Sequence, residues 1–244
     1  VSPLLKASIA KAGFTTPTPI QAGAIPPGLE GRDIIGAAQT GTGKTAAFVI
    51  PIVERLRNRR GLGALILTPT RELALQIEDV FHQLARGQVR VTNVIGGASM
   101  SMQHRALRAQ PNVIIATPGR LLDHLGQQTL DLRVLKILVL DEADRMLDMG
   151  FAPQINRILA AVPKERQTML FSATIPQEIA QMTGLTDATA RNAAITALEG
   201  AAVTVFAQQY LTAPMLLAMP EDMRRTYLDR VPPQVRDLVM VEAV

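Results

Sequence analysis

The chain has 244 residues, enough for one large domain, and hydrophobic residues make up 48% of it, so a substantial core can be buried. Its formal net charge of +4 is compatible with an anionic partner, while an aromatic content of only 3% argues against a stacking platform for single-stranded bases as the main binding device. The absence of cysteine excludes disulfides and thiolate metal sites, and because neither a leader-like segment nor a long uncharged apolar run occurs, we expect a soluble, cytoplasmic protein that does not span a membrane.

The N-terminal residues predict a short helix followed by a constrained loop. Residues 4–12 have a helical pattern. Residues 14–21 contain Pro17 and Pro19, which fix φ and disfavour a helix. Gln21 carries an amide that can both donate to and accept from an adenine edge. A glutamine that merely starts a helix is the alternative, and the residue taken alone favours that alternative.

Beyond the loop, apolar strand-like runs alternate with helical patterns. Continuous apolar strands separated by helices indicate an α/β fold with a mostly parallel sheet and helices on both faces. The expected strands are residues 33–37, 64–68, 89–95, 112–116, 136–140 and 168–172. The expected helices are residues 44–58, 71–86, 101–109, 120–126, 152–162 and 177–184.

The loops that follow these strands hold the unusual residues of the chain. In a parallel sheet the carboxyl ends of the strands meet at one edge, where ligands bind. We therefore expect one edge of the sheet to collect every polar or glycine-rich loop. These loops are residues 38–45, 69–72, 96–97, 117–120, 141–144 and 172–174.

The first of these loops has the parts of a phosphate-binding loop. It lies between an apolar run and a helical pattern and ends in Gly-Lys-Thr. Gly41 and Gly43 let the backbone turn tightly, so that its N–H groups, those of Thr40 and Thr42 included, can converge on phosphate oxygens. The helix that begins at the loop also directs its positive end toward the anion.

Two side chains complete the expected phosphate site. Lys44 places an ammonium near the β- and γ-phosphates, and Thr45 places a hydroxyl on Mg²⁺. The strict pattern has glycine where this chain has Ala38. A Gly/Thr-rich turn that only caps a helix is the alternative, which the flanking strand and helix disfavour.

Carboxylates end the strand expected at residues 136–140. Asp141 can hold Mg²⁺, usually through water, and Glu142 can polarise an attacking water. Acidic residues also favour the first turn of a solvated helix, but pairing with the glycine-rich loop favours the metal site. The hydroxyls of Ser172 and Thr174 could hydrogen-bond Asp144 or serve as simple caps.

Another group of residues suits a phosphate backbone. Arginine offers forked donors, glycine allows close approach, and threonine offers a hydroxyl. The alternatives are a surface ion pair between Arg71 and Glu72 and a plain turn at residues 96–97. The group is Arg71, Gly97, Thr117, Gly119 and Arg120.

Two further residue classes are expected to be structural. His82, His104 and His124 lie on expected helices without a paired spacing, so we expect them to be structural or exposed and not metal ligands. Met146 and Met149 are expected to fill the core.

Taken together, these segments resemble the first RecA-like domain of a DEAD-box RNA helicase. The family tolerates Ala38 in its phosphate loop. Order and spacing agree from about residue 4 to residue 185, and although each motif is modest alone, the ordered set is highly specific. The matching segments are residues 13–21 (Q motif), 38–45 (motif I), 69–74 (motif Ia), 96–97 (GG element), 117–120 (motif Ib), 141–144 (motif II) and 172–174 (motif III).

The resemblance implies a RecA-like P-loop domain, here residues 1–206, that uses ATP and Mg²⁺. It implies adenine read by Gln21 with Phe14 stacking nearby, and RNA held by its backbone without strong sequence preference. It implies catalytic roles for Lys44, Asp141 and Glu142. The residues implied to couple this domain to a second one are Asp144, Ser172 and Thr174.

Beyond residue 185 the resemblance weakens. Residues 186–200 read as an Ala/Thr-rich helix-like insertion, and residues 207–244 form a tail that could be a truncated start of the second RecA-like domain, an altered terminus or a packing element. Because the arginine-rich motif of the second domain has no match, we expect the isolated chain to bind nucleotide but hardly turn it over. The alternatives are a non-catalytic nucleotide- or RNA-binding module and a DNA-directed motor, the latter disfavoured by Gln21 and by Asp-Glu-Ala-Asp.

Overall fold

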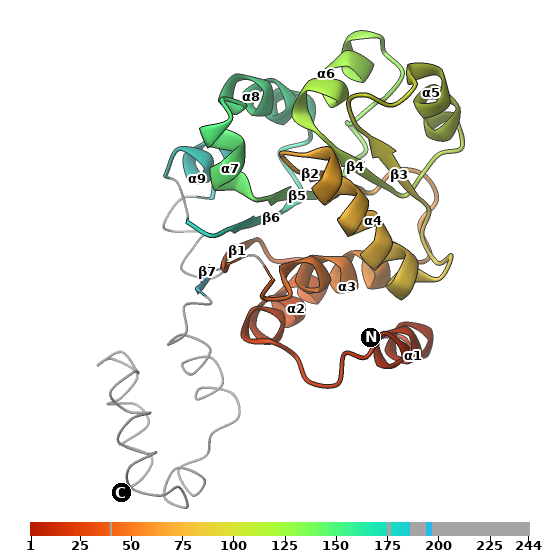
Figure 1. The fold of residues 1–244 in the computed structure, drawn as a ribbon, viewed down its shortest axis with the longest axis vertical. Helices are drawn as coiled ribbons and strands as arrows, with labels where there is room; N and C mark the ends of the chain where they lie inside the picture. The colour runs from red at the N-terminus through yellow and green to blue at the C-terminus, as the bar shows by residue number, and fades with distance from the viewer. Residues whose placement is uncertain (40, 175–176, 186–193, 197–244) are drawn as a thin grey trace, which may run out of the picture.

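The structure is a computed structural model that describes residues 1–39, 41–174, 177–185 and 194–196 (Figure 1). Thr40 and the expected tail at residues 207–244 therefore lie outside the described residues, as does the expected domain boundary at residue 206.

The described residues form one parallel sheet of seven strands in the order β3-β4-β2-β5-β6-β1-β7. The parallel sheet expected from the apolar runs is confirmed, and the six expected strands match β1 to β6 to within two residues at each end. The strands are β1 Ile34–Ala37, β2 Ala64–Leu67, β3 Val91–Val94, β4 Val113–Ala116, β5 Ile137–Asp141, β6 Gln167–Ser172 and β7 Ala194–Thr196.

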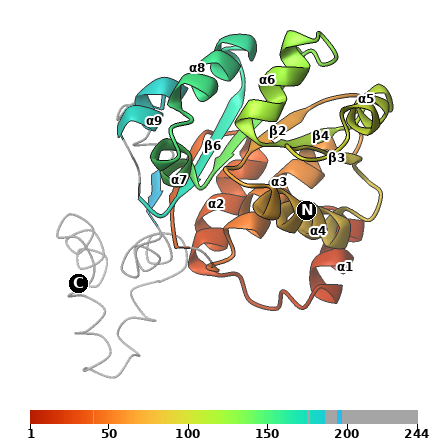
Figure 2. The ribbon, with the colours of Figure 1, turned by 45° about the horizontal axis from the view of Figure 1, so that its top comes forward.

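Helices cover both faces of the sheet (Figures 1 and 2). Successive strand side chains point to opposite faces, so Ile66 and Val139 pack in one cluster while Leu65 and Leu138 pack in the other. The first face is covered by α1 Pro3–Lys11, α2 Pro19–Glu30, α3 Lys44–Leu56 and α4 Arg71–Ala85. The second is covered by α5 Met100–Arg108, α6 Pro118–Gly126, α7 Ala143–Asp148, α8 Ala152–Ala161 and α9 Gln177–Thr183.

The non-helical loop expected through residue 21 is wrong from Pro19 onward, because α2 begins there. Proline is tolerated in the first turn of a helix, where its missing N–H would have no intrahelical partner. Pro26 and Pro27 lie inside the same helix. Tertiary packing offsets their cost: α2 lies so close to α3 that a Cβ added at Gly28 would come 2.7 Å from Pro51 Cγ.

Two smaller expectations are also corrected. Part of the segment expected to be helix-like, Ala194–Thr196, is strand β7, which pairs in parallel with β1. An open strand edge offers unpaired peptide groups, and pairing with them overrides the helix propensity of alanine. Met146 is fully buried as expected, but Met149 is 49% exposed. Met149 lies at the end of the short helix α7, where it faces solvent and not the core.

The strand order sorts the unusual loops into two groups. The loops after β1, β5 and β6 hold the expected phosphate loop, the acidic segment and residues 172–174. Those after β2, β3 and β4 hold Arg71, residues 96–97 and residues 117–120. Because the strands are parallel, both groups lie on one edge of the sheet, side by side.

Candidate functional site

The segment between β1 and α3 has the tight turn that a phosphate loop requires. Gly41 and Gly43 have φ of 85° and 91°, a left-handed conformation that favours glycine. Thr42 Oγ1 donates to the Gln39 carbonyl oxygen at 2.7 Å, which closes the turn. Since α3 begins at Lys44, the unpaired N–H groups of its first turn face the same loop.

Lys44 and Asp141 form the buried centre of the site. Lys44 is 6% exposed, and its Nζ donates to the Ala38 carbonyl oxygen at 2.8 Å. Asp141 ends β5, the strand expected to deliver it. Burial raises the pKa of Asp141 to about 6, although the positive charge of Lys44 opposes the rise. A divalent cation at this carboxyl group would favour its charged form, so the dry oxygen donor beside an anion-binding loop fits Mg²⁺.

Glu142 is held in a strained conformation next to Asp141. Its φ of 51° and ψ of 51° are left-handed, which for a residue other than glycine costs about 1–3 kcal/mol. Its mostly buried carboxylate accepts from Arg145 Nη1 at 3.2 Å. Arg145 therefore orients the side chain expected to polarise water. Sequence reasoning missed Arg145, and its position three residues after Glu142 on a helix was the available signal.

The hydroxyl contacts expected around Asp144 are present. Ser172 Oγ accepts from the Asp144 N–H at 3.0 Å. The N–H and hydroxyl of Thr174 donate to Asp144 Oδ2 at 3.0 and 3.2 Å. Burial alone would raise the pKa of Asp144, but these hydrogen bonds outweigh it and hold the pKa below its usual value. The contacts tie the start of α7 to the end of β6.

Gln21 joins the first turn of α2 to the phosphate loop. Its Oε1 accepts from the Thr18 N–H at 3.0 Å, as in the helix-start alternative. Its Nε2 donates to the Gly43 carbonyl oxygen at 3.2 Å. A Cβ added at Gly43 would lie only 2.5 Å from Gln21 Nε2, so the contact requires glycine there. Phe14 is half-buried and packs against the core cluster that contains Ile20.

The expected backbone-binding residues gather around the loop of residues 96–98. The guanidinium of Arg71, the first residue of α4, lies against Gly97, where an added Cβ would collide with Nη1. From the first turn of α6, Arg120 Nη1 donates to the Ala98 carbonyl oxygen at 2.9 Å. Thr117 precedes the same helix, and its N–H donates to the Val94 carbonyl oxygen at 3.2 Å. Gly119 is exposed, with no atom within 4 Å of an added Cβ.

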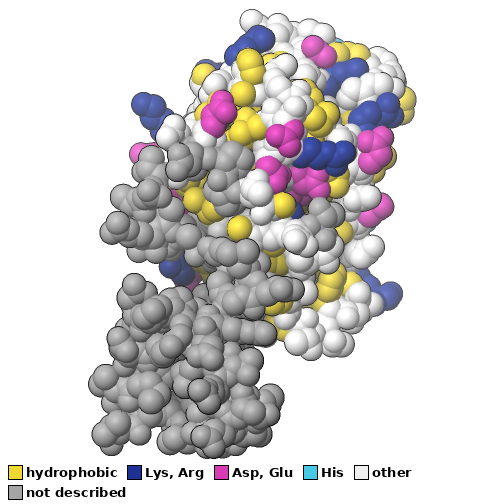
Figure 3. All heavy atoms as spheres, turned by 60° about the vertical axis from the view of Figure 1, so that its left-hand side comes forward, with side chains coloured by type: hydrophobic (Ala, Val, Ile, Leu, Met, Phe, Trp, Pro, Cys, Tyr) yellow, Lys and Arg dark blue, Asp and Glu magenta, His cyan; other side chains and the backbone are white. Residues whose placement is uncertain are grey.

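Two features of the surface lie apart from this arrangement. On the face that Figure 3 presents, basic and acidic side chains are interspersed and form no continuous area of one sign.

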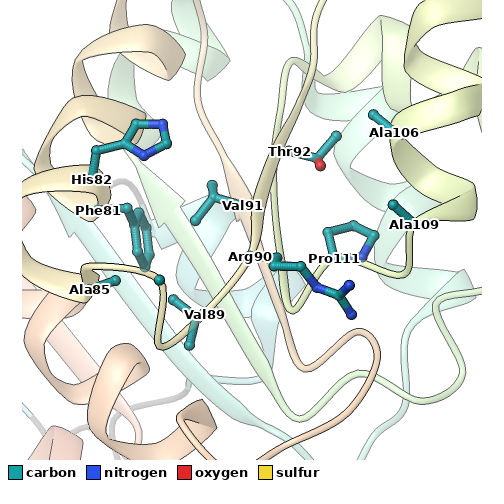
Figure 4. A pocket seen from close by; sticks show the side chains of 11 residues that line it. Phe81, His82, Ala85, Val89, Arg90, Val91, Thr92, Ala106, Ala109 and Pro111 are labelled. Atoms are coloured by element: carbon teal, nitrogen blue, oxygen red, sulfur yellow. The ribbon is translucent and has the colours of Figure 1, made fainter.

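A cavity of about 400 Å³ opens between α4, β3 and α5 and is lined by Phe81, Val91 and Ala106 among others (Figure 4). None of the expected site residues lines this cavity, so we do not assign it to the site.

The described residues offer neither a metal-ion cluster nor a membrane-spanning helix. Among the residues that the structure describes, no group of three or more His, Cys, Asp and Glu side chains could hold a metal ion. No described helix combines the length and apolar character needed to cross a membrane.

Comparison with known proteins identifies the family. The DEAD/DEAH box helicase family profile matches residues 18–182. The chain belongs to the DEAD/DEAH box helicase family. The matched range contains the glycine-rich loop and the Asp-Glu-Ala-Asp segment. It also contains the expected backbone-binding residues, which we call the Arg/Gly surface: Arg71, Gly97, Thr117, Gly119 and Arg120. Phe14 lies just before the matched range.

Individual members of the DEAD/DEAH box family are closely similar. The chain is 50% identical over 176 residues to a DEAD-box ATP-dependent RNA helicase of Helicobacter pylori, covering 72% of this chain and 36% of that protein. It is 51% identical over 183 residues to an ATP-dependent rRNA helicase of Meyerozyma guilliermondii, covering 74% of this chain and 38% of that protein. The chain thus spans less than two fifths of these curated relatives.

A solved structure agrees with the fold of this DEAD/DEAH box domain. A DEAD box protein from the hyperthermophile Methanococcus jannaschii matches with a TM-score of 0.72 and 41% sequence identity. The match covers 75% of this chain and 51% of that one. The α/β architecture expected from the resemblance is therefore confirmed.

Proposed function

We propose that this chain is the ATP-binding domain of a DEAD-box RNA helicase, in which ATP hydrolysis is coupled to separation of RNA strands. The observation that carries the proposal is the buried pair of Lys44 and Asp141 at a glycine-rich turn, on the same sheet edge as the Arg71 and Arg120 surface. We assign residues 1–206 to the RecA-like domain. For residues 207–244 the alternatives remain a truncated start of the second RecA-like domain, an altered terminus and a packing element.

In this proposal the phosphates of ATP lie on the glycine-rich loop. The N–H groups of residues 41–43 and the first turn of α3 would donate to phosphate oxygens, and Lys44 would place its ammonium near the β- and γ-phosphates. Thr45 and Asp141 would hold Mg²⁺, which when bound neutralises developing phosphate charge. Glu142, kept in place by Arg145, accepts a proton from the attacking water.

Two residues are proposed to recognise the base. Among the described residues, Gln21 donates to Gly43 and accepts from Thr18, and an amide has a second N–H and a second lone pair besides these. This second N–H donor and second acceptor on the Gln21 amide match the acceptor and donor on the edge of adenine. Phe14 offers an aromatic face on which the base could stack. The bond from Gln21 to Gly43 joins base recognition to the phosphate loop.

The Arg/Gly surface is proposed to hold the RNA backbone. Arg71 and Arg120 supply charged donors, and the exposed backbone at Gly97 and Gly119 allows close approach of phosphate. Thr117 adds a hydroxyl between them. Asp144, Ser172 and Thr174 form a hydrogen-bonded unit that joins α7 to the end of β6, and we propose that it couples this domain to a second one.

The isolated chain is expected to bind Mg-ATP but to hydrolyse it negligibly. A single-turnover hydrolysis assay tests this expectation and, with it, the proposed function. Lys44 and Mg²⁺ meet the transferring phosphoryl group from one side only, and an arginine finger from a second domain is worth roughly 10³- to 10⁵-fold in rate. We expect single-turnover hydrolysis to become fast only when RNA and the second RecA-like domain of a family member are both added.

A Lys44→Ala variant serves as the control in that assay. RNA-stimulated turnover by the isolated chain, abolished in the control, would contradict the prediction and show that residues beyond 185 or a second copy supply the missing groups. No turnover even with RNA and the second domain would instead favour a non-catalytic binding module.

RNA binding is expected to be weak, salt-sensitive and nearly independent of sequence. Arg120→Ala should weaken binding to every sequence alike and lower the slope of log affinity against log salt by about one. Fluorescence anisotropy with labelled homopolymers over a salt series measures both quantities. Arg133→Ala is the matched control, because Arg133 is exposed and pairs only locally with Asp131. A strong preference for one base sequence would contradict backbone recognition.

A further inference from the structure

Two polar side chains are buried directly beneath the loop of residues 96–98, and the proposed function does not use them. Gln103 of α5 is 5% exposed and His124 of α6 is 0% exposed. Gln103 Nε2 donates to the carbonyl oxygen of Ile95, the residue before Gly96, at 2.9 Å. Gln103 Oε1 lies 3.1 Å from His124 Nε2. One amide thus joins the residue that leads into the loop to the helix that carries Arg120.

The hydrogen bonds of this link have a definite direction. Since the Gln103 Nε2 donates to a carbonyl, its Oε1 must accept, and His124 Nε2 therefore carries the hydrogen. Burial, followed by the neighbouring charges of His104 and Arg120, lowers the pKa of His124. In the neutral ring Nδ1 is an acceptor and lies 2.8 Å from the Thr129 hydroxyl, which also donates to the His124 carbonyl oxygen at 3.1 Å. The amide nitrogen and oxygen of Gln103 and both ring nitrogens of His124 therefore each lie within hydrogen-bond distance of a partner.

The other contacts to the loop of residues 96–98 come from the two arginines that are proposed to bind RNA. Arg120 Nη1 donates to Ala98, and the guanidinium of Arg71 lies against Gly97. A guanidinium has five N–H donors, so a phosphate that binds either arginine shares this side chain with the loop. The side chain of Gln103 is buried, so its hydrogen bonds to the loop are not shared with RNA.

We propose that Gln103 and His124 are positioning residues that hold the Gly97 backbone in register with Arg120 while RNA is bound. The proposal rests on the proposed function, because it assumes that this surface takes an RNA backbone. Neither side chain touches RNA. Their hydrogen bonds fix the distance between a close-approach glycine on one loop and a charged donor on α6, so that one stretch of backbone can contact both.

The test compares Gln103→Leu with the parent chain for RNA affinity, salt dependence and Mg-ATP affinity. We expect RNA affinity to fall about tenfold, as for loss of a buried hydrogen-bonded partner, while the salt slope stays unchanged because no phosphate contact is deleted. Mg-ATP affinity should also be unchanged, because the nucleotide loops lie on other strands. Gln83→Leu on α4, where the glutamine is exposed, is the matched control and should bind RNA as the parent does.

A second pair of variants keeps the test decisive if Gln103→Leu does not fold. His124→Gln retains an N–H near the position of Nε2 and should keep RNA affinity, whereas His124→Phe removes it and should lose affinity as Gln103→Leu does. Unchanged affinity in Gln103→Leu or His124→Phe, when Arg120→Ala is weakened, would overturn this inference alone. A reduced salt slope in Gln103→Leu would overturn it too, because the slope would indicate a direct phosphate contact. Failure of the parent chain to bind RNA would overturn the proposed RNA surface and the inference together.

Discussion

Replacing Lys44 with alanine is expected to weaken Mg-ATP and Mg-ADP binding by roughly a hundredfold while the fold stays intact. The ammonium is buried, and its Nζ is fixed by the Ala38 carbonyl oxygen, so it is ready to meet phosphate without reorganisation. A charge held in a dry site interacts more strongly than one in water. Alanine removes that charge and leaves the backbone N–H groups of the loop to bind phosphate alone. Isothermal titration calorimetry measures the loss.

Lys136→Ala is the matched control for this experiment. Lys136 is exposed and lies just before β5, at the opposite edge of the sheet from the phosphate loop. Its removal should leave nucleotide affinity and the melting temperature unchanged. Calorimetry that shows equal affinity for Lys44→Ala and the parent would remove Lys44 from the proposed site.

Replacing Glu142 with glutamine is expected to separate binding from hydrolysis. The amide is nearly isosteric and can still accept from Arg145, so the strained backbone and Mg-ATP affinity should be retained. It is a poor base, however, and general-base catalysis is typically worth roughly 10²- to 10⁴-fold. We expect the single-turnover rate, measured with RNA and the second RecA-like domain of a family member, to fall within that range.

Glu165→Gln provides the comparison, since Glu165 is exposed and lies before β6, away from the carboxyl edge of the sheet. Its hydrolysis rate should equal that of the parent. If Glu142→Gln also hydrolyses ATP at the parental rate, the attacking water must be polarised by another group. If it instead fails to bind Mg-ATP, Glu142 would have a binding role in place of the proposed one.

Sequence reasoning located the sheet well because its strands are buried on both faces. Strand β2 has four consecutive apolar residues between Gly63 and Pro69, which favours a short buried strand over a helix, and the helix after it begins at the Thr70 cap. The helix α2 was missed because prolines normally break helices, and only the tertiary position of Pro19 in a first turn shows why it does not. Strand β7 was missed for a related reason: its pairing with β1 is invisible in its own residues.

Within the site, the motif residues were found because their chemistry is carried by local patterns. Lys44, Asp141 and Glu142 each end or begin an element, and the parallel sheet brings them together. The supporting residues Arg145 and Gln103 were not found, and His124 was expected only to be structural or exposed. Arg145, Gln103 and His124 act through partners on neighbouring turns or on other elements, and nothing in the order of the residues shows that an amide on α5 contacts a ring on α6.

The strand order carries a consequence for how the two proposed ligands could influence each other. The loops proposed to bind nucleotide follow β1, β5 and β6, and those proposed to bind RNA follow β2, β3 and β4. Within the sheet the two halves meet where β2 pairs with β5. That boundary includes fully buried side chains such as Ile66 and Val139, and closely packed interiors resist small shifts. Thermodynamic linkage requires an element that both ligands can shift between two arrangements. Since a closely packed seam resists such a shift, we expect cooperativity between ATP and RNA to depend on a body that contacts both halves more than on movement within the sheet.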